Sequence, residues 1–355
     1  MTTTQPRRFG FKRWIVLGLM VLGGWLAFSV GGIFKPVSPA VVLPPEAIWH
    51  GLRLLPDVPG LWKDVWFSNT ILSALIADIV LIVLALGARN FVASGKLVPT
   101  GFYNFFEWLV EFLWNMTESA AGKWAKAMFP IMATIFMLVF TANMIKLVPG
   151  FESIGWLEQA EGSIKGYAPV KILGGFITAI DGSHQVTVAE GETAHAAPAE
   201  GEHEAACTSC TVVPFLRATA TDLNFTFALA VVAVVMIQYF GFRAQGMGYL
   251  GKFINTRTMI SKPIFGFIDF GVGLLELVSE FAKILSFGFR LFGNIFAGAL
   301  LLAILGALTA VAVPSMLYGL EAFVGVIQAY VFAMLALTFM SQATVSHSEH
   351  AEDGH

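Results

Sequence analysis

Charged residues are scarce in this chain of 355 residues. They make up 13% of the sequence, roughly half the share of a typical soluble domain, while hydrophobic residues make up 56% and the mean hydropathy is +0.73. These values exclude a soluble globular protein and predict an integral membrane protein. The net charge of −3, together with the lack of basic stretches interleaved with aromatic residues, excludes a nucleic-acid partner.

Two kinds of functional site have little support. No sequence of the form G-x-x-x-x-G-K-[ST] is present, so we expect no nucleotide site and no catalytic activity on this chain. The two cysteines, Cys207 and Cys210, are too few for a disulfide scaffold. With His184, His195 and His203 they could hold a metal, but histidines scattered through a polar loop are more often solvated. We therefore expect a disulfide or free thiols there, with no metal and no cofactor.

Long apolar segments make up much of the sequence. Those able to cross about 30 Å of hydrocarbon lie at 14–34, 67–88, 127–148, 219–242, 264–313 and 314–343. The expected fold is therefore an all-α polytopic membrane protein with about six membrane helices. A continuous helix over 264–313 would be about 75 Å long, so we expect the last two helices to be long and steeply tilted rather than bent or broken.

Composition divides the chain into three parts. Residues 1–66 hold an extra N-terminal membrane segment, or a signal sequence, followed by an external linker. Residues 67–345 hold the main membrane domain, with a hydrophilic external insert at 149–216. Within the insert, the His/Ala/Glu-rich run 189–206 lacks apolar material for a core, so we expect a mobile hairpin. Residues 346–355 form a polar C-terminal tail.

Two patterns predict how the chain meets the bilayer. In segment 101–122, Glu107, Glu111 and Glu118 share one helical face and aromatic residues fill the other, which predicts an amphipathic helix in the cytoplasmic interface. Six crossings put both termini on one side. With the N-terminus inside, twelve lysines and arginines are cytoplasmic and seven are external, so the positive-inside rule favours a cytoplasmic C-terminus.

A narrow line of polar side chains runs along the fifth apolar segment. At 100° per residue, six residues fall within an arc of about 80°: Asp269, Glu276, Glu280, Lys283, Arg290 and Asn294. An arginine at bilayer depth costs about 2.5–3.5 kcal/mol on insertion scales, so Arg290 must face protein or water, usually for function. Carboxylates in an apolar wall can pass protons on, which suggests a path that ends at the Arg290 charge barrier.

The same residues also permit a structural interpretation. Either Glu280 or Glu276 could simply neutralise Lys283 inside a helical bundle. Arg290 differs, because the nearest acid before it on this face, Glu280, is about 15 Å away along the helix axis. The countercharge of Arg290 must therefore come from another helix or another chain.

Two further pairs of polar residues are candidates. Glu321 and Gln328 share one face of the last segment, where Glu321 could meet a proton entering from outside. Gln328 could bond Arg290, line a water path or satisfy a neighbouring helix. Asp222 and Asn224 mark the external start of the fourth segment, where Asp222 is either a helix cap or part of an entrance for protons.

The residues around Arg290 resemble a known family. The similarity lies in Ser286-Phe-Gly-Phe-Arg290-Leu-Phe-Gly-Asn294-Ile-Phe-Ala-Gly298, Leu275-Glu276-Leu-Val-Ser279 and Ile327-Gln328-Ala-Tyr330, and more weakly in 143–149 and 222–224. Together these runs resemble subunit a of F-type ATP synthases over roughly 67–345, apart from the insert.

The resemblance implies the stationary subunit of a rotary motor. In this family, subunit a offers two half-channels to a ring of c subunits, and an arginine separates them. By residue match Arg290 is that arginine, and the matched polar positions along the path and its external entrance are Asn294, Gln328, Glu321, Glu276, Asp222 and Asn224. The implied partners are the c-ring, the b subunits of the peripheral stalk, other Fo/F1 subunits and the lipid of a bacterial-type inner (plasma) membrane.

Some positions depart from the family pattern. Ala299 stands where many bacterial relatives have an acidic residue or histidine, and Lys146 stands where an acidic residue is common. The alternative function is a secondary proton-coupled transporter that works as a single chain through Glu276, Glu280 and Glu321. A purely structural membrane anchor is a third interpretation.

Overall fold

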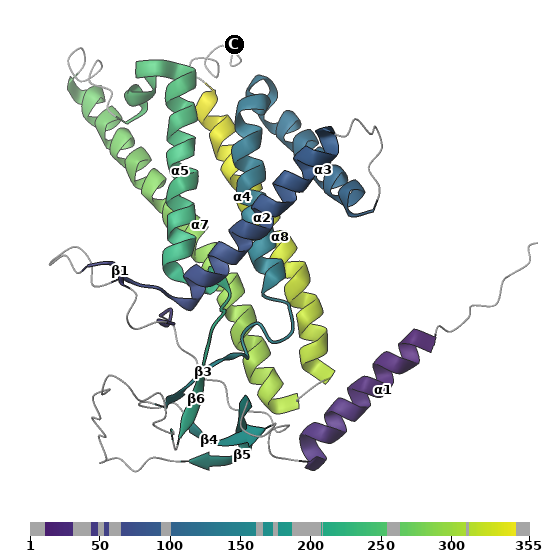
Figure 1. Ribbon diagram of the computed structural model, residues 1–355. Helices are drawn as coiled ribbons and strands as arrows, with labels where there is room; N and C mark the ends of the chain where they lie inside the picture. Colours follow the sequence, from purple (N-terminus) through teal and green to yellow (C-terminus); the bar gives the residue numbers. More distant parts are fainter. Residues whose placement is uncertain are drawn as a thin grey trace, which may run out of the picture. The chain divides into compact units, whose positions relative to one another are not determined.

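Helices make up most of the structure, a computed structural model (Figure 1). The structure describes residues 11–30, 44–48, 53–56, 65–93, 101–160, 166–172, 177–186, 207, 209–253, 263–309 and 312–345. The chain falls into two units, which are considered separately. The first comprises 1–48, 150–216 and 297–321, and the second comprises 49–149, 217–296 and 322–355.

The second unit is a bundle of helices. Its elements, in chain order, are β1 (Arg53–Leu55), β2 (Val65–Trp66), α2 (Asn69–Ala93), α3 (Phe102–Ala121), η3 (Gly122–Trp124), α4 (Ala125–Ile145), η5 (Thr219–Thr221), α5 (Leu223–Gln245) and η6 (Gly246–Lys252). Large parts of α7 (Pro263–Thr309) and α8 (Ala312–Thr344) complete it. The first unit holds α1 (Phe11–Trp25), η1 (Leu26–Val30), β3 (Gly155–Gln159), β4 (Gly166–Ile172), β5 (Ile177–Val186), β6 (Cys210–Pro214) and the adjoining ends of α7 and α8.

The expected polytopic helical fold is confirmed. Within the described residues, five helical stretches are long and apolar enough to span a membrane: Asn69–Phe91, Phe102–Ile145, Leu223–Gly251, Phe270–Thr309 and Val313–Thr344. The apolar part of α1, Trp14–Trp25, is shorter, and the end of the first expected crossing, 14–34, lies outside the described residues. Helix α7 is one continuous element of 47 residues, about 70 Å long, and it contains no break.

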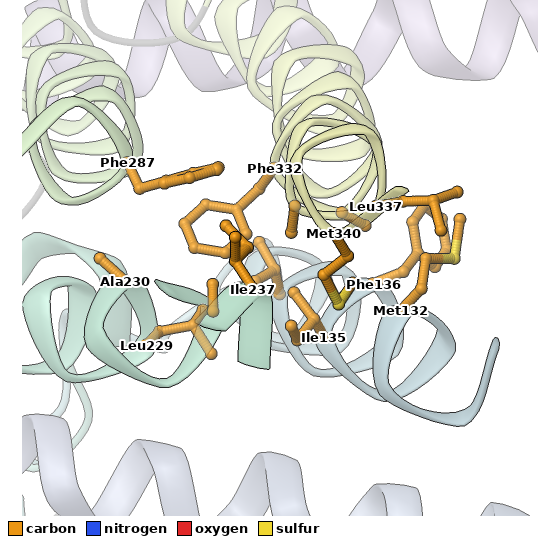
Figure 2. Close-up of a cluster of buried hydrophobic side chains, with 14 of the residues drawn as sticks. Met132, Ile135, Phe136, Leu229, Ala230, Ile237, Phe287, Phe332, Leu337 and Met340 are labelled. Carbon is orange, nitrogen blue, oxygen red and sulfur yellow. The ribbon is translucent and has the colours of Figure 1, made fainter. Parts of the chain in front are cut away.

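Four helices of the second unit share one apolar core. Figure 2 shows side chains of α4, α5, α7 and α8 meeting there, among them Ile135, Ile237, Phe287, Phe332 and Met340. In lipid, such contacts gain little from leaving water, so close van der Waals packing holds the helices together. Small residues of α8 permit that packing, since its fully buried positions include Ala329, Ala333 and Ala336.

A glycine on α8 brings α4 especially close. A Cβ on Gly325 would lie 3.0 Å from the Cβ of Asn143, so a larger residue would push the two helices apart. The Asn143 amide uses this approach, because its Nδ2 donates to the Gly325 carbonyl at 3.2 Å. A buried polar side chain in α4 is thereby satisfied by backbone.

Helix α3 has the amphipathic character expected of segment 101–122. Its buried residues are Leu109, Leu113, Thr117 and Ala121, and they pack against α4. Its three glutamates, Glu107, Glu111 and Glu118, are exposed. The position of α3 in a membrane interface stays a prediction.

The insert differs from the hairpin expected for it. In the described parts, β3, β6, β4 and β5 form a four-stranded antiparallel sheet in that order. The expectation was wrong because it gave weight to the low-complexity run, whereas the flanks are rich in β-branched residues that favour strands. A disulfide joins Cys207 to Cys210, which settles the choice between a disulfide and free thiols. The run 189–206 lies outside the described residues.

We expect Leu337→Ala to destabilise the bundle by about 2–5 kcal/mol, because the leucine has no exposed surface and its loss leaves a cavity. The measurement is the midpoint temperature for heat aggregation of the detergent-solubilised protein. Leu86→Ala on α2, where the side chain is 52% exposed, is the matched control and should shift the midpoint far less. Equal shifts in the two variants would contradict the placement of Leu337 in the core.

Candidate functional site

Arg290 lies within α7 and is partly exposed. Its guanidinium makes one hydrogen bond, from Nη2 to Ser286 Oγ at 3.4 Å, one helical turn earlier. Among the residues that the structure describes, it makes no ion pair. That the countercharge of Arg290 comes from another helix or another chain stays a prediction.

Asn294 and Gln328 join α7 to α8. Asn294 Nδ2 donates to Gln328 Oε1 at 2.7 Å, so Gln328 makes the interhelical bond that was one of its expected roles. Gln328 is 3% exposed, and within the described part of the chain its Nε2 has no hydrogen-bond partner. A buried donor left unsatisfied costs about 1–3 kcal/mol, which favours a water or another polar group beside it.

Glu321 is buried against the backbone of α7. Its side chain is 9% exposed, and its Oε1 lies 2.9 Å from where a Cβ on Gly298 would stand. Any larger residue at Gly298 would displace the carboxylate. The small residue at Gly298 is thus explained by packing within this chain.

The other small residues near Arg290 separate into two kinds. A Cβ on Gly288 would meet the Phe227 ring at 3.0 Å, so Gly288 also serves packing within the chain. A Cβ on Gly293 would meet nothing within 4 Å among the described atoms. Gly293 follows Arg290 by three residues on the helix, and the exposed Asn294 and Ala297 continue that face.

Glu280 forms the local ion pair that the sequence left open. Lys283 Nζ donates to Glu280 Oε1 at 2.7 Å, and Gln238 Nε2 of α5 donates to Glu280 Oε2 at 2.8 Å. Glu280 is 6% exposed, whereas Glu276 is half-buried one turn earlier. The structure therefore brings Glu280 together with Lys283 and Gln238.

Asp222 caps helix α5. Its Oδ1 accepts from the backbone N–H of Asn224 at 2.9 Å, and its Oδ2 accepts from Thr70 Oγ1 of α2 at 2.8 Å. The capping role that the sequence allowed is thus realised, and it is combined with a bond between two helices. Asn224 itself is exposed, and it contributes its backbone to the cap.

Sequence reasoning missed three residues that hold this arrangement. Thr70 fixes Asp222, while Gln238 and Tyr249 extend the contacts of Glu280, with Tyr249 Oη donating to Gln238 Oε1 at 2.8 Å. A signal for Gln238 was present, since it is a lone amide in the apolar run 229–240. Tyr249 carried no such signal, because its role depends on how the chain folds back after α5.

Comparison with known families decides the assignment. The protein-family model described as ATP synthase A chain matches residues 70–341, which is most of the chain. The chain belongs to the ATP synthase A chain family. The match spans the polar residues described above, from Asp222 to Gln328, and it confirms the resemblance to subunit a of F-type ATP synthases.

Family membership places the chain in the ATP synthase complex. It is a multi-pass membrane protein, and its family is the proton-channel subunit of the membrane sector, Fo. This agrees with the expectation that the chain takes part in ATP synthesis through proton transport. Helix α1 lies outside the matched residues.

We expect Asp222→Ala to destabilise the start of α5, because loss of a helix cap costs about 0.5–2 kcal/mol and Thr70 loses its acceptor as well. Asp222→Asn should be milder, since an amide oxygen can still accept from the Asn224 N–H. Midpoints of heat aggregation for the two variants measure the difference. An asparagine variant as unstable as the alanine variant would show that the cap is not what Asp222 supplies.

Proposed function

We propose that this chain is the stationary proton-translocating subunit of the rotary Fo motor, and that Arg290 separates two half-channels that open to opposite sides of the membrane. One observation carries the proposal: Arg290 is a permanent cation on a long apolar helix, and it makes no ion pair among the described residues. Such a charge is retained in a membrane only where it meets protein or water.

The face of α7 that carries Arg290 suits a moving partner. Gly293 leaves open space beside the arginine, and the flanking Leu285 and Phe289 are about half exposed. Together they offer a low, apolar surface on which another helix can approach closely. We propose that this partner is the c-ring, whose carboxylates pair with Arg290 in their ionised form and are protonated after they leave it.

The polar side chains on either side of Arg290 supply the two paths. Glu321, buried beside Gly298, can accept and release a proton, and the spare donor of Gln328 suits an ordered water. Asn294 holds Gln328 in place. Asp222 and Asn224 mark the external entrance. Glu276 lies on the part of α7 that precedes Arg290.

The disulfide supports an orientation for the chain. Disulfides persist in oxidising compartments such as the bacterial periplasm, so the insert with Cys207 and Cys210 belongs outside. Among the described residues, three candidate spans follow it, in α5, α7 and α8, and an odd number of crossings would put the C-terminus in the cytoplasm. The proposed location is a bacterial-type inner membrane, with the b subunits of the peripheral stalk as further partners.

A secondary transporter remains the alternative, and the contacts of Glu280 count against it. The transporter would load protons on Glu276, Glu280 and Glu321, and one of these three, Glu280, has both carboxylate oxygens occupied by donors. Reconstitution of the purified chain alone separates the two functions. Coupled solute uptake without c subunits would favour the transporter.

We expect Arg290→Ala to abolish proton-driven ATP synthesis in inverted membrane vesicles, because nothing then keeps protons from passing between the half-channels without turning the ring. Arg243→Ala, which removes an exposed arginine of α5 bonded to Tyr239, is the control and should retain synthesis. Full synthesis by the Arg290 variant would remove this residue from the mechanism.

The proposed orientation predicts a labelling pattern. In intact spheroplasts treated with a membrane-impermeant reductant, Cys207 and Cys210 should react with an impermeant maleimide. In a variant lacking both native cysteines, Ser346→Cys should react only after the membrane is opened. The reverse pattern would place the C-terminus outside.

A further inference from the structure

Glu280 belongs to a hydrogen-bonded chain that joins three elements of the second unit. Tyr249 of η6 donates to Gln238 of α5, Gln238 donates to Glu280 of α7, and Lys283 pairs with the other carboxylate oxygen, at 2.8, 2.8 and 2.7 Å. Tyr249 is 1% exposed and its ring lies against Gly241. Because Tyr249 occupies the amide oxygen of Gln238, the amide nitrogen faces Glu280, and donors hold both oxygens of an ionised carboxylate.

Lys283 is held toward the interior of the bundle. Its ammonium lies 5.0 Å from the centroid of the Phe339 ring of α8, and that ring packs edge-on against Phe287. The lysine side chain is 17% exposed. A cation placed between a carboxylate and an aromatic face is neutralised within its own chain.

The position of Lys283 gives this pairing a consequence for Arg290. Lys283 precedes Arg290 by seven residues, which puts the two cations about 20° apart around α7 and about 10 Å apart along it. A free ammonium there would be a second cation on the same line. A passing carboxylate would then bind at two places instead of one, since charges attract strongly in a medium of low dielectric constant.

We propose that Glu280 masks Lys283, so that Arg290 is the cation of this line that receives the carboxylate of the partner ring. This inference rests on the proposed function. It makes Glu280, with Gln238 and Tyr249 behind it, a set of positioning residues that decide where the rotor carboxylate pauses. It also replaces the sequence-based prediction that Glu280 carries protons.

The test uses the whole ATP synthase in inverted vesicles and three variants: Glu280→Gln, Lys283→Gln and the double variant. Unmasking Lys283 in Glu280→Gln should lower ATP-driven proton pumping about tenfold, the factor that corresponds to about 1.4 kcal/mol of extra binding at the second cation. Removing the lysine as well should restore pumping to within about twofold of the unaltered enzyme. Lys283→Gln alone should lose less than Glu280→Gln.

Other patterns would overturn the inference. If Glu280 carries protons, the double variant stays as impaired as Glu280→Gln, and if the pair serves stability alone, both single variants lose the chain from the membrane in an immunoblot. Unchanged pumping in Glu280→Gln would equally exclude masking. Tyr249→Phe, which frees Gln238 to turn its amide, gives a second measurement and should produce an intermediate loss.

Arg290→Ala in the same vesicles separates the two proposals. If Arg290→Ala abolishes synthesis while the double variant does not recover proton pumping, the masking inference is wrong and the proposed function still holds. If it retains synthesis, the proposed function fails whatever the Glu280 variants do.

Discussion

The organisation of the polar residues depends on one guanidinium that cannot become neutral. Arginine keeps its proton at any pH the cell reaches, so Arg290 cannot reduce its cost in the membrane by deprotonation. Two carboxylates of the second unit are satisfied within the chain: Glu280 by Lys283 and Gln238, and Asp222 by Thr70 and the N–H of Asn224. We propose that the ionic partner of Arg290 lies in another subunit of the complex.

Glycines let helices approach closely, and this approach determines where two polar side chains lie. Gly298 leaves room for the Glu321 carboxylate, and Gly325 lets Asn143 reach a backbone carbonyl of α8. In both places an added methyl group would come closer to its neighbour than ordinary van der Waals contact, so the neighbouring side chain would have to shift. Gly293 contrasts with them, because the described chain leaves the space beside it open, which suits a surface that another helix passes.

In our proposal, the ion pair of Glu280 removes a second positive charge from the line of Arg290. The Arg290 motif alone would leave Lys283 as a second cation on α7, and the buried carboxylate removes that charge at a cost in desolvation that the Gln238 hydrogen bond helps to offset. Tyr249 then orients the amide from a turn that follows α5. Three elements, η6, α5 and α7, thus take part in one hydrogen-bonded chain around Glu280.

The sequence by itself determined the membrane class, the long helices and the phase of the polar line on α7, because hydropathy and helical periodicity act locally along the chain. It also contained the family motif around Arg290. Only the tertiary structure decided the partners: that Glu280 pairs with Lys283 and Gln238, that Gln328 meets Asn294, and that the flanks of the insert form a sheet. Glu280 and Lys283 lie one turn apart on α7, and spacing allowed that pair without choosing it over Glu276 and Lys283. The other contacts join residues far apart in the chain, and spacing along one segment carries no information about which side chain of another segment comes within hydrogen-bond distance.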